Sequence, residues 1–157
     1  MQAHQPGLGG QFVRRLGRLA VRFYYPRIEF TGRDHIPDKG SVLVCANHAN
    51  SLLDPVLVGM TARRPVRFFA KAPLFKTPVL GPLMEALGMI PAFRGQDDRR
   101  QVKNNQQSLD KGVNALVQGD AVGIFPEGKS HDYLRVVMVR SGAARMALAA
   151  ERQGAEK

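Results

Sequence analysis

Short apolar runs that alternate with stretches of helical spacing constrain the fold of this chain more than any other feature. Four runs suit buried strands, at residues 42–46, 66–70, 89–93 and 121–125, and an alternating run at 28–31 adds a fifth. Helical spacing of apolar residues covers 11–25, 52–62, about 83–87 and 97–118. Strands that alternate with helices predict an α/β fold, with a mostly parallel sheet flanked by helices.

Residues able to do chemistry follow three of the predicted strands. His48 comes just after the run at 42–46, Arg94 ends the run at 89–93, and Glu127 follows the run at 121–125. Ligands of open α/β sheets bind outside the carboxyl ends of the strands. We therefore expect these three side chains at one edge of the sheet.

His48 has a carboxylate one short turn downstream, at Asp54. The helix at 52–62 can be capped by Asn50 or Ser51, which places Asp54 in its first turn. An imidazole can take a proton from a hydroxyl while a carboxylate fixes its tautomer and stabilises the imidazolium. The pair indicates transfer chemistry on an alcohol, although a His and an Asp at this spacing also occur as structural residues.

Three further segments accompany this pair, in the order Phe68-Phe69-Ala70-Lys71, Gly88-Met89-Ile90-Pro91-Ala92-Phe93-Arg94 and Phe125-Pro126-Glu127-Gly128. Together with the His48 segment they resemble the glycerolipid acyltransferase family, whose members acylate glycerol-3-phosphate and lysophosphatidic acid. The resemblance runs from about residue 28 to residue 148. Five residues separate His48 from Asp54, where most members have four. The longer spacing is similar to a subset that includes glycerol-3-phosphate acyltransferases.

The resemblance implies a role for each matching residue. His48 is the general base and Asp54 orients it. Arg94 binds the phosphate of the acceptor, and Lys71 is a second phosphate contact. Glu127 contacts the glycerol hydroxyls of the acceptor, with Gly128 beside it. The sequence itself assigns no oxyanion donor, and main-chain N–H groups near Gly128 are one candidate.

A structural interpretation of each site residue stays open from the sequence alone. Glu127 suits a solvated turn, Arg94 suits a surface ion pair with a following aspartate, and Lys71 suits an exposed position. Ser130 and His131 are most typical of structural or rim residues. The single cysteine, at position 45 inside an apolar run, suits a small buried side chain and a reducing compartment.

The formal charge of +10 predicts a polyanionic partner. Residues 11–25 combine an apolar face with four arginines and no acid, which favours a helix in the headgroup layer of an anionic membrane; the alternative is a helix packed on the core. No helix-turn-helix or zinc spacing supports specific nucleic-acid binding. No apolar run approaches the roughly 18 residues that span a bilayer. We expect a peripheral protein on the cytoplasmic side of a membrane.

The predicted organisation is an N-terminal tail and amphipathic membrane-surface helix at 1–26, then an acyltransferase domain at 27–157 that lacks the C-terminal strand usual in the family. The predicted function is O-acyl transfer, outside the amino-acyl class, from acyl-CoA or acyl carrier protein to a hydroxyl of a glycerol-phosphate or lysophospholipid acceptor. Acyl-CoA or the carrier is a co-substrate, and no metal or redox cofactor is expected. The alternative is a non-catalytic basic module that binds anionic lipid or nucleic acid.

Overall fold

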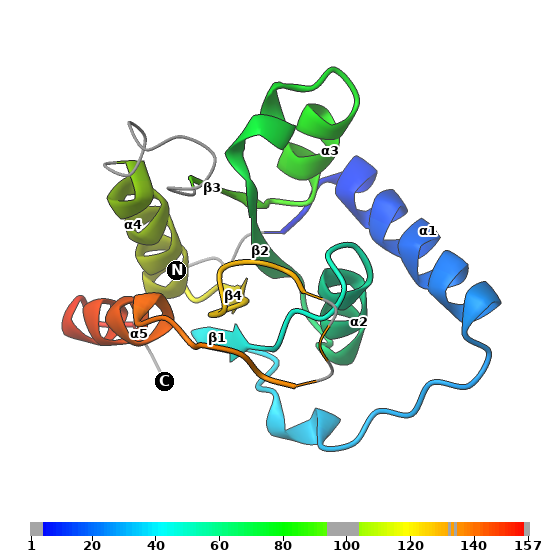
Figure 1. The fold of residues 1–157 in the computed structure, drawn as a ribbon, viewed down its shortest axis with the longest axis horizontal. Coiled ribbons are helices and arrows are strands. Elements are labelled where there is room, and N and C mark those ends of the chain that lie inside the picture. The colour runs from blue at the N-terminus through cyan, green and yellow to red at the C-terminus, as the bar shows by residue number, and fades with distance from the viewer. Residues whose placement is uncertain (1–4, 94–103, 132, 134, 156–157) are drawn as a thin grey trace.

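The computed structural model describes residues 5–93, 104–131, 133 and 135–155. Four strands form one sheet in the order β1-β4-β2-β3, with every pairing parallel (Figure 1). The strands are β1 (Val42–Cys45), β2 (Val66–Lys71), β3 (Ile90–Ala92) and β4 (Ala121–Ile124). The predicted α/β class with a parallel sheet is confirmed.

Five α-helices and two 3-10 helices are described around this sheet. They are α1 (Leu8–Tyr24), η1 (Arg33–His35), α2 (Leu53–Thr61), η2 (Ala72–Lys76), α3 (Leu80–Ala86), α4 (Asn104–Val117) and α5 (Gly142–Arg152). In Figure 1, α4 and α5 lie side by side at one flank, whereas α1, α2 and α3 lie at the other. One apolar core joins α4 and α5 to the sheet through Val122 and Met146, and a second surrounds Phe68 of β2.

A glycine in strand β4 lets an aromatic side chain of the neighbouring strand β2 lie close to the main chain. A Cβ added to Gly123 would overlap the ring of Phe68 from the adjacent strand β2. Phe68 is buried, and its ring lies 5.8 Å from that of Phe125, which follows β4. The glycine therefore makes room for an aromatic stack that leads toward the end of the strand.

Several predicted boundaries are wrong. Residues 28–31 form no strand, because no neighbouring strand pairs with them in the described chain. The first helix begins at Leu8, three residues before its predicted start. Helix α3 begins at Leu80 and includes Pro82 in its first turn, where a missing N–H costs no helical hydrogen bond. The predicted helical segment at 97–103 lies outside the described residues.

Cys45 also departs from its prediction. It is exposed at the end of β1, which is an edge strand. The apolar run that contains it suggests burial, but β1 pairs with a described strand along one edge only, and its last residue stays open to solvent. Burial of part of the side chain raises the pKa of the Cys45 thiol, which keeps this thiol less reactive than a free one.

Candidate active site

His48 lies just beyond the carboxyl end of β1, where the main chain still runs beside β4. The Ala46 N–H donates to the carbonyl of Ile124, which extends the pairing past the end of the strand. The imidazole of His48 stacks on the Phe125 ring, with ring centroids 4.0 Å apart and planes 11° apart. His48 is only 7% exposed. The end of the sheet thus supplies a flat apolar support for the ring.

The carboxylate of Asp54 fixes the orientation of His48. Nδ1 of His48 lies 3.0 Å from Oδ2 of Asp54, and the same oxygen accepts the Asn50 N–H at 2.7 Å. Because an ionised carboxylate can only accept, Nδ1 carries the proton and Nε2 keeps its lone pair. Among the described residues, none forms a hydrogen bond with Nε2. His48 is therefore arranged to act as a base through Nε2.

Asn50 organises the start of helix α2 and so places Asp54. Its side-chain oxygen accepts the N–H groups of Leu52 and Leu53 at 3.2 and 3.1 Å. Of the two capping candidates in the sequence, Asn50 makes these bonds. Asp54 stands in the first turn of α2, where the positive end of the helix dipole stabilises a carboxylate. The local sequence thus directs Asp54 at His48.

Glu127 is held inside the protein by several hydrogen bonds. It is 2% exposed, and its oxygens face the protein. Oε2 accepts the His48 N–H at 3.1 Å and lies 2.6 Å from Nε2 of His131, while Oε1 accepts the Val137 N–H at 3.3 Å. This carboxylate is not in a solvated turn, and its contact with the acceptor stays a prediction. It ties the main chain of His48 to the turn after β4.

The environment of Glu127 favours its ionised form. Burial alone would raise the pKa of this carboxyl. The hydrogen bond from His131 and the main-chain N–H groups of His48 and Val137 together hold its pKa below the ordinary value. A buried carboxylate with three donors is thus stable as an anion.

Gly128 adopts a positive φ of 75°, and its N–H donates to the carbonyl of Phe125 at 3.0 Å. That bond engages the N–H within the turn, so the expectation of an oxyanion donor does not apply to Gly128 itself in this structure. The side chain of Arg140 lies against Gly128, with its Nε 3.2 Å from where a Cβ would stand. The missing side chain lets an arginine lie against the turn.

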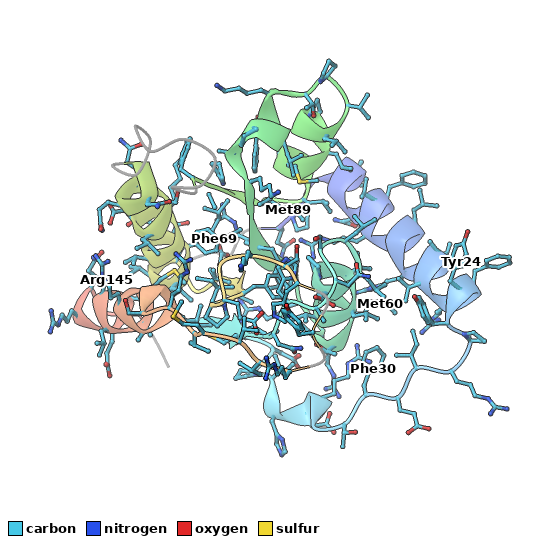
Figure 2. All side chains as sticks on the ribbon, viewed as in Figure 1. Tyr24, Phe30, Met60, Phe69, Met89 and Arg145 are labelled. Carbon is cyan, nitrogen blue, oxygen red and sulfur yellow. The ribbon has the colours of Figure 1, made fainter. Side chains whose placement is uncertain are left out.

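A cleft of about 540 Å³ opens beside His48. Its apolar wall includes Phe69, Ala70, Ala92, Leu109 and Ile124, and its polar lining includes Ser108, Arg140 and Arg145. Figure 2 shows the labelled Phe69 near the centre of the molecule and Arg145 on α5. Among the described residues, no carboxylate pairs with Arg140. The cleft thus combines a base, an apolar wall and positive charge.

Of the predicted site residues, His48 and Gly128 line this cleft, and Asp54 and Glu127 bond to His48 without lining it. Lys71 ends β2 with an exposed side chain and does not line the cleft. Arg94 lies outside the described residues. Sequence reasoning missed Phe125 as the support of His48, because ring stacking between two strand ends depends on strand order. It also missed Arg140 and Arg145 as cleft residues, because both are distant from His48 in sequence and lie outside the family motifs. Across the described ranges, no cluster of three or more His, Cys, Asp or Glu is arranged to hold a metal ion.

Comparison with known proteins identifies the family of this chain. The acyltransferase family model matches residues 27–154, which is most of the chain. The chain belongs to the acyltransferase family. It is 27% identical over 122 residues to a 1-acyl-sn-glycerol-3-phosphate acyltransferase of Borreliella burgdorferi, covering 78% of this chain and 46% of that protein.

A chloroplastic relative from Arabidopsis thaliana, 1-acyl-sn-glycerol-3-phosphate acyltransferase LPAT1, is 25% identical over 132 residues, which cover 84% of this acyltransferase chain and 35% of LPAT1. The chain therefore spans less than half the length of these two relatives. No solved structure is a significant match.

The buried anion predicts how stability depends on pH. Because the pKa of Glu127 is lower in the folded chain than its ordinary 4.5, its contribution is complete above that pH and is lost as pH falls through the folded value. Glu127→Gln should lower the free energy of unfolding at pH 7 by about 1.5 to 3 kcal/mol, the contribution of a hydrogen bond to a charged group. Urea unfolding at several pH values measures this, and the gap to the unsubstituted chain should narrow below pH 4.5.

Glu85→Gln, at an exposed position of α3, is the control for the loss of a negative charge. The alternative result is that Glu127→Gln lowers the free energy of unfolding by the same amount at pH 7 and in acid. That result would contradict the ionised state of Glu127.

Proposed function

We propose that this acyltransferase moves a fatty acyl group from acyl-CoA or acyl carrier protein to a hydroxyl of a glycerol-phosphate or lysophospholipid acceptor. The observation that carries the proposal is the His48–Asp54 pair beside a cleft, with Nδ1 of His48 3.0 Å from Asp54 and Nε2 without a hydrogen bond to any described residue. Phospholipid biosynthesis is the pathway that the names of the relatives favour.

The chemistry follows from the orientation of the imidazole. Nε2 of His48 removes the proton of the acceptor hydroxyl as its oxygen attacks the thioester carbonyl. The tetrahedral intermediate then collapses, the carbon–sulfur bond breaks, and the imidazolium returns the proton to the departing thiolate. Asp54 stabilises the imidazolium between these steps. Positioned general-base catalysis of this kind accelerates a reaction roughly 10²- to 10⁴-fold.

The cleft suits a substrate with both an apolar and an anionic part. Phe69, Ala92 and Ile124 offer apolar surface beside His48, and Arg140 and Arg145 offer guanidinium groups. A guanidinium binds phosphate oxygens through two parallel hydrogen bonds. We extend the expected phosphate site at Arg94 to include Arg140. Lys71, whose side chain does not line the cleft, is not retained as the second phosphate contact.

The first prediction concerns the base itself. His48→Ala should abolish thiol release from acyl-CoA, and Asp54→Asn should lower it by about 10²-fold or more through a wrong tautomer. A thiol-release assay with glycerol-3-phosphate and lysophosphatidic acid as acceptors measures both, and circular dichroism checks that the variants fold. His35→Ala, which removes an exposed histidine of η1, is the control. Near-normal release from His48→Ala would exclude the proposed mechanism.

Arg140 and Arg94 are predicted to discriminate acceptors by their phosphate. Arg140→Ala or Arg94→Ala should raise the KM for a phosphorylated acceptor by about 10- to 150-fold, which corresponds to a charged hydrogen bond of about 1.5 to 3 kcal/mol. Monoacylglycerol, which has no phosphate, should be affected little. The lysine variant at either position should recover part of the loss, because an ammonium carries the same charge but cannot form two parallel hydrogen bonds to a phosphate. An equal loss on both acceptors would rule out the phosphate contact.

A membrane surface is the proposed location of the reaction. Helix α1 packs against α2 and α3, yet its large apolar residues stay exposed: Leu8, Phe12, Leu16, Leu19, Phe23 and Tyr24. In Figure 2, the side chain of Tyr24 points away from the body of the protein. Arg14 turns inward to the carbonyl of Leu87 at 3.1 Å. No helix in the described parts of the chain is long and apolar enough to cross a membrane.

The exposed apolar residues of α1 form an apolar stripe, which favours a helix that inserts this stripe among lipid headgroups. The other arginines of α1 then face anionic lipid. A Leu16→Ser, Leu19→Ser double variant should weaken binding to phosphatidylglycerol vesicles about 10-fold or more, because each leucine loses its buried apolar surface. Co-sedimentation at rising salt measures this, and salt should weaken binding of the unsubstituted chain. The control is Leu148→Ser, at an exposed position of α5. Unchanged binding of the double variant would refute the proposed membrane contact of α1. Vesicle binding without thiol release would favour the non-catalytic basic module.

A further inference from the structure

The turn after β4 holds the main chain of His48 by both of its polar groups. The His48 N–H donates to Oε2 of Glu127 at 3.1 Å, and the His48 carbonyl accepts the His131 N–H at 3.0 Å. Ser51 and Ser130 join the same two segments through their hydroxyls. The position of the catalytic imidazole therefore depends on residues 127–131 as well as on Asp54.

The tautomer of His131 follows from its two hydrogen bonds. The Tyr133 N–H donates to Nδ1 of His131 at 3.2 Å, so Nδ1 must keep its lone pair. The ring proton of the neutral imidazole then resides on Nε2, which lies 2.6 Å from Oε2 of Glu127. The side chains of His131 and Glu127 are 6% and 0% exposed. His131 is thus the donor that a buried carboxylate requires.

One oxygen of Glu127 joins both histidines, since Oε2 accepts from His131 and from the His48 main chain. We propose that His131 is a positioning residue of the active site, which holds the Glu127 carboxylate and, through it, the main chain of His48. The two histidines then have opposite tautomers: His48 is protonated on Nδ1 and His131 on Nε2. This inference rests on the proposed acyl transfer, because His131 itself does not contact the reacting atoms.

Substitution of His131 by asparagine or glutamine distinguishes a positioning role of this residue from a packing role. The amide nitrogen of glutamine reaches about the place of Nε2 in histidine, whereas that of asparagine reaches only the place of Nδ1. His131→Asn should lower kcat by about 10- to 100-fold, because a displacement on the scale of an ångström at a catalytic group has this effect. The KM values should change less than about 3-fold, since substrate contacts are kept. His131→Gln should keep kcat within about 5-fold of the unsubstituted chain.

The kinetic experiment uses the whole chain, with His35→Gln as the control for loss of a histidine at an exposed position of η1. Melting temperatures of all variants are measured in parallel. Equal loss of kcat in the Gln and Asn variants, or a loss of kcat in His131→Asn matched by an equal rise in KM, would overturn the proposal. Retention of kcat in His131→Asn would overturn it as well.

Nitrogen-15 NMR of the histidine rings tests the same inference without activity. In the unsubstituted chain, the ring shifts should show a protonated Nδ1 for His48 and a protonated Nε2 for His131. The His48 main-chain amide should shift in His131→Asn and stay close to its original position in His131→Gln. A protonated Nδ1 in His131 would overturn the proposal. If thiol release does not depend on His48, the acyl-transfer function fails, whereas the NMR result still decides whether His131 positions His48.

Discussion

The parallel pairing of β1 with β4 is the constraint on which the active site depends. Its register sets Val42 opposite Ala121 and Cys45 opposite Ile124, so the loops that leave these two strands start side by side. Residues 79 positions apart in sequence can then share hydrogen bonds, as His48 and Glu127 do. Formation of this pair closes a long loop, and the buried bonds at its end offset part of that entropic cost.

Two histidine–carboxylate pairs lie within this small region, and their burial assigns them different tasks. The Asp54 side chain is 18% exposed and leaves Nε2 of His48 facing the cleft. The Glu127 side chain is fully buried and uses both oxygens on the protein. A carboxylate that stabilises a transient imidazolium works beside a substrate, whereas a buried one with several donors stabilises the geometry of a loop. In our proposals, the same pair of residue types serves chemistry in one place and positioning in the other.

The arrangement of α1 complements the site. Its apolar stripe stays exposed because the helix uses Gly10 and Val21, its buried positions, for contact with the rest of the chain. The Cβ of an alanine at Gly10 would overlap the main-chain oxygen of Ala86 at the end of α3, so the close approach there needs glycine. A helix attached along a narrow line retains most of its surface for another partner, and its composition favours lipid.

The sequence by itself determined the local parts of this site. Asp54 lies six positions from His48 and at the start of a helix, so residue spacing and capping chemistry predict that the two meet. The strand runs likewise predict the parallel sheet, because buried strands must be apolar on both faces. The family motifs also indicate the acyltransferase family, and the match of the family model to residues 27–154 confirms that membership.

Only the tertiary structure decided what depends on strand order and on packing between distant segments. The engagement of Glu127 with His48 and His131, the entry of Arg140 into the cleft and the exposure of Cys45 all follow from which strands are neighbours. Residues 28–31 alternate like a strand but form none, since a strand needs a hydrogen-bonding partner. Periodicity shows that α1 has an apolar face without showing where that face points. Spacing along the chain encodes contacts within a few residues, whereas contacts across the sheet depend on register, and register is a property of the whole fold.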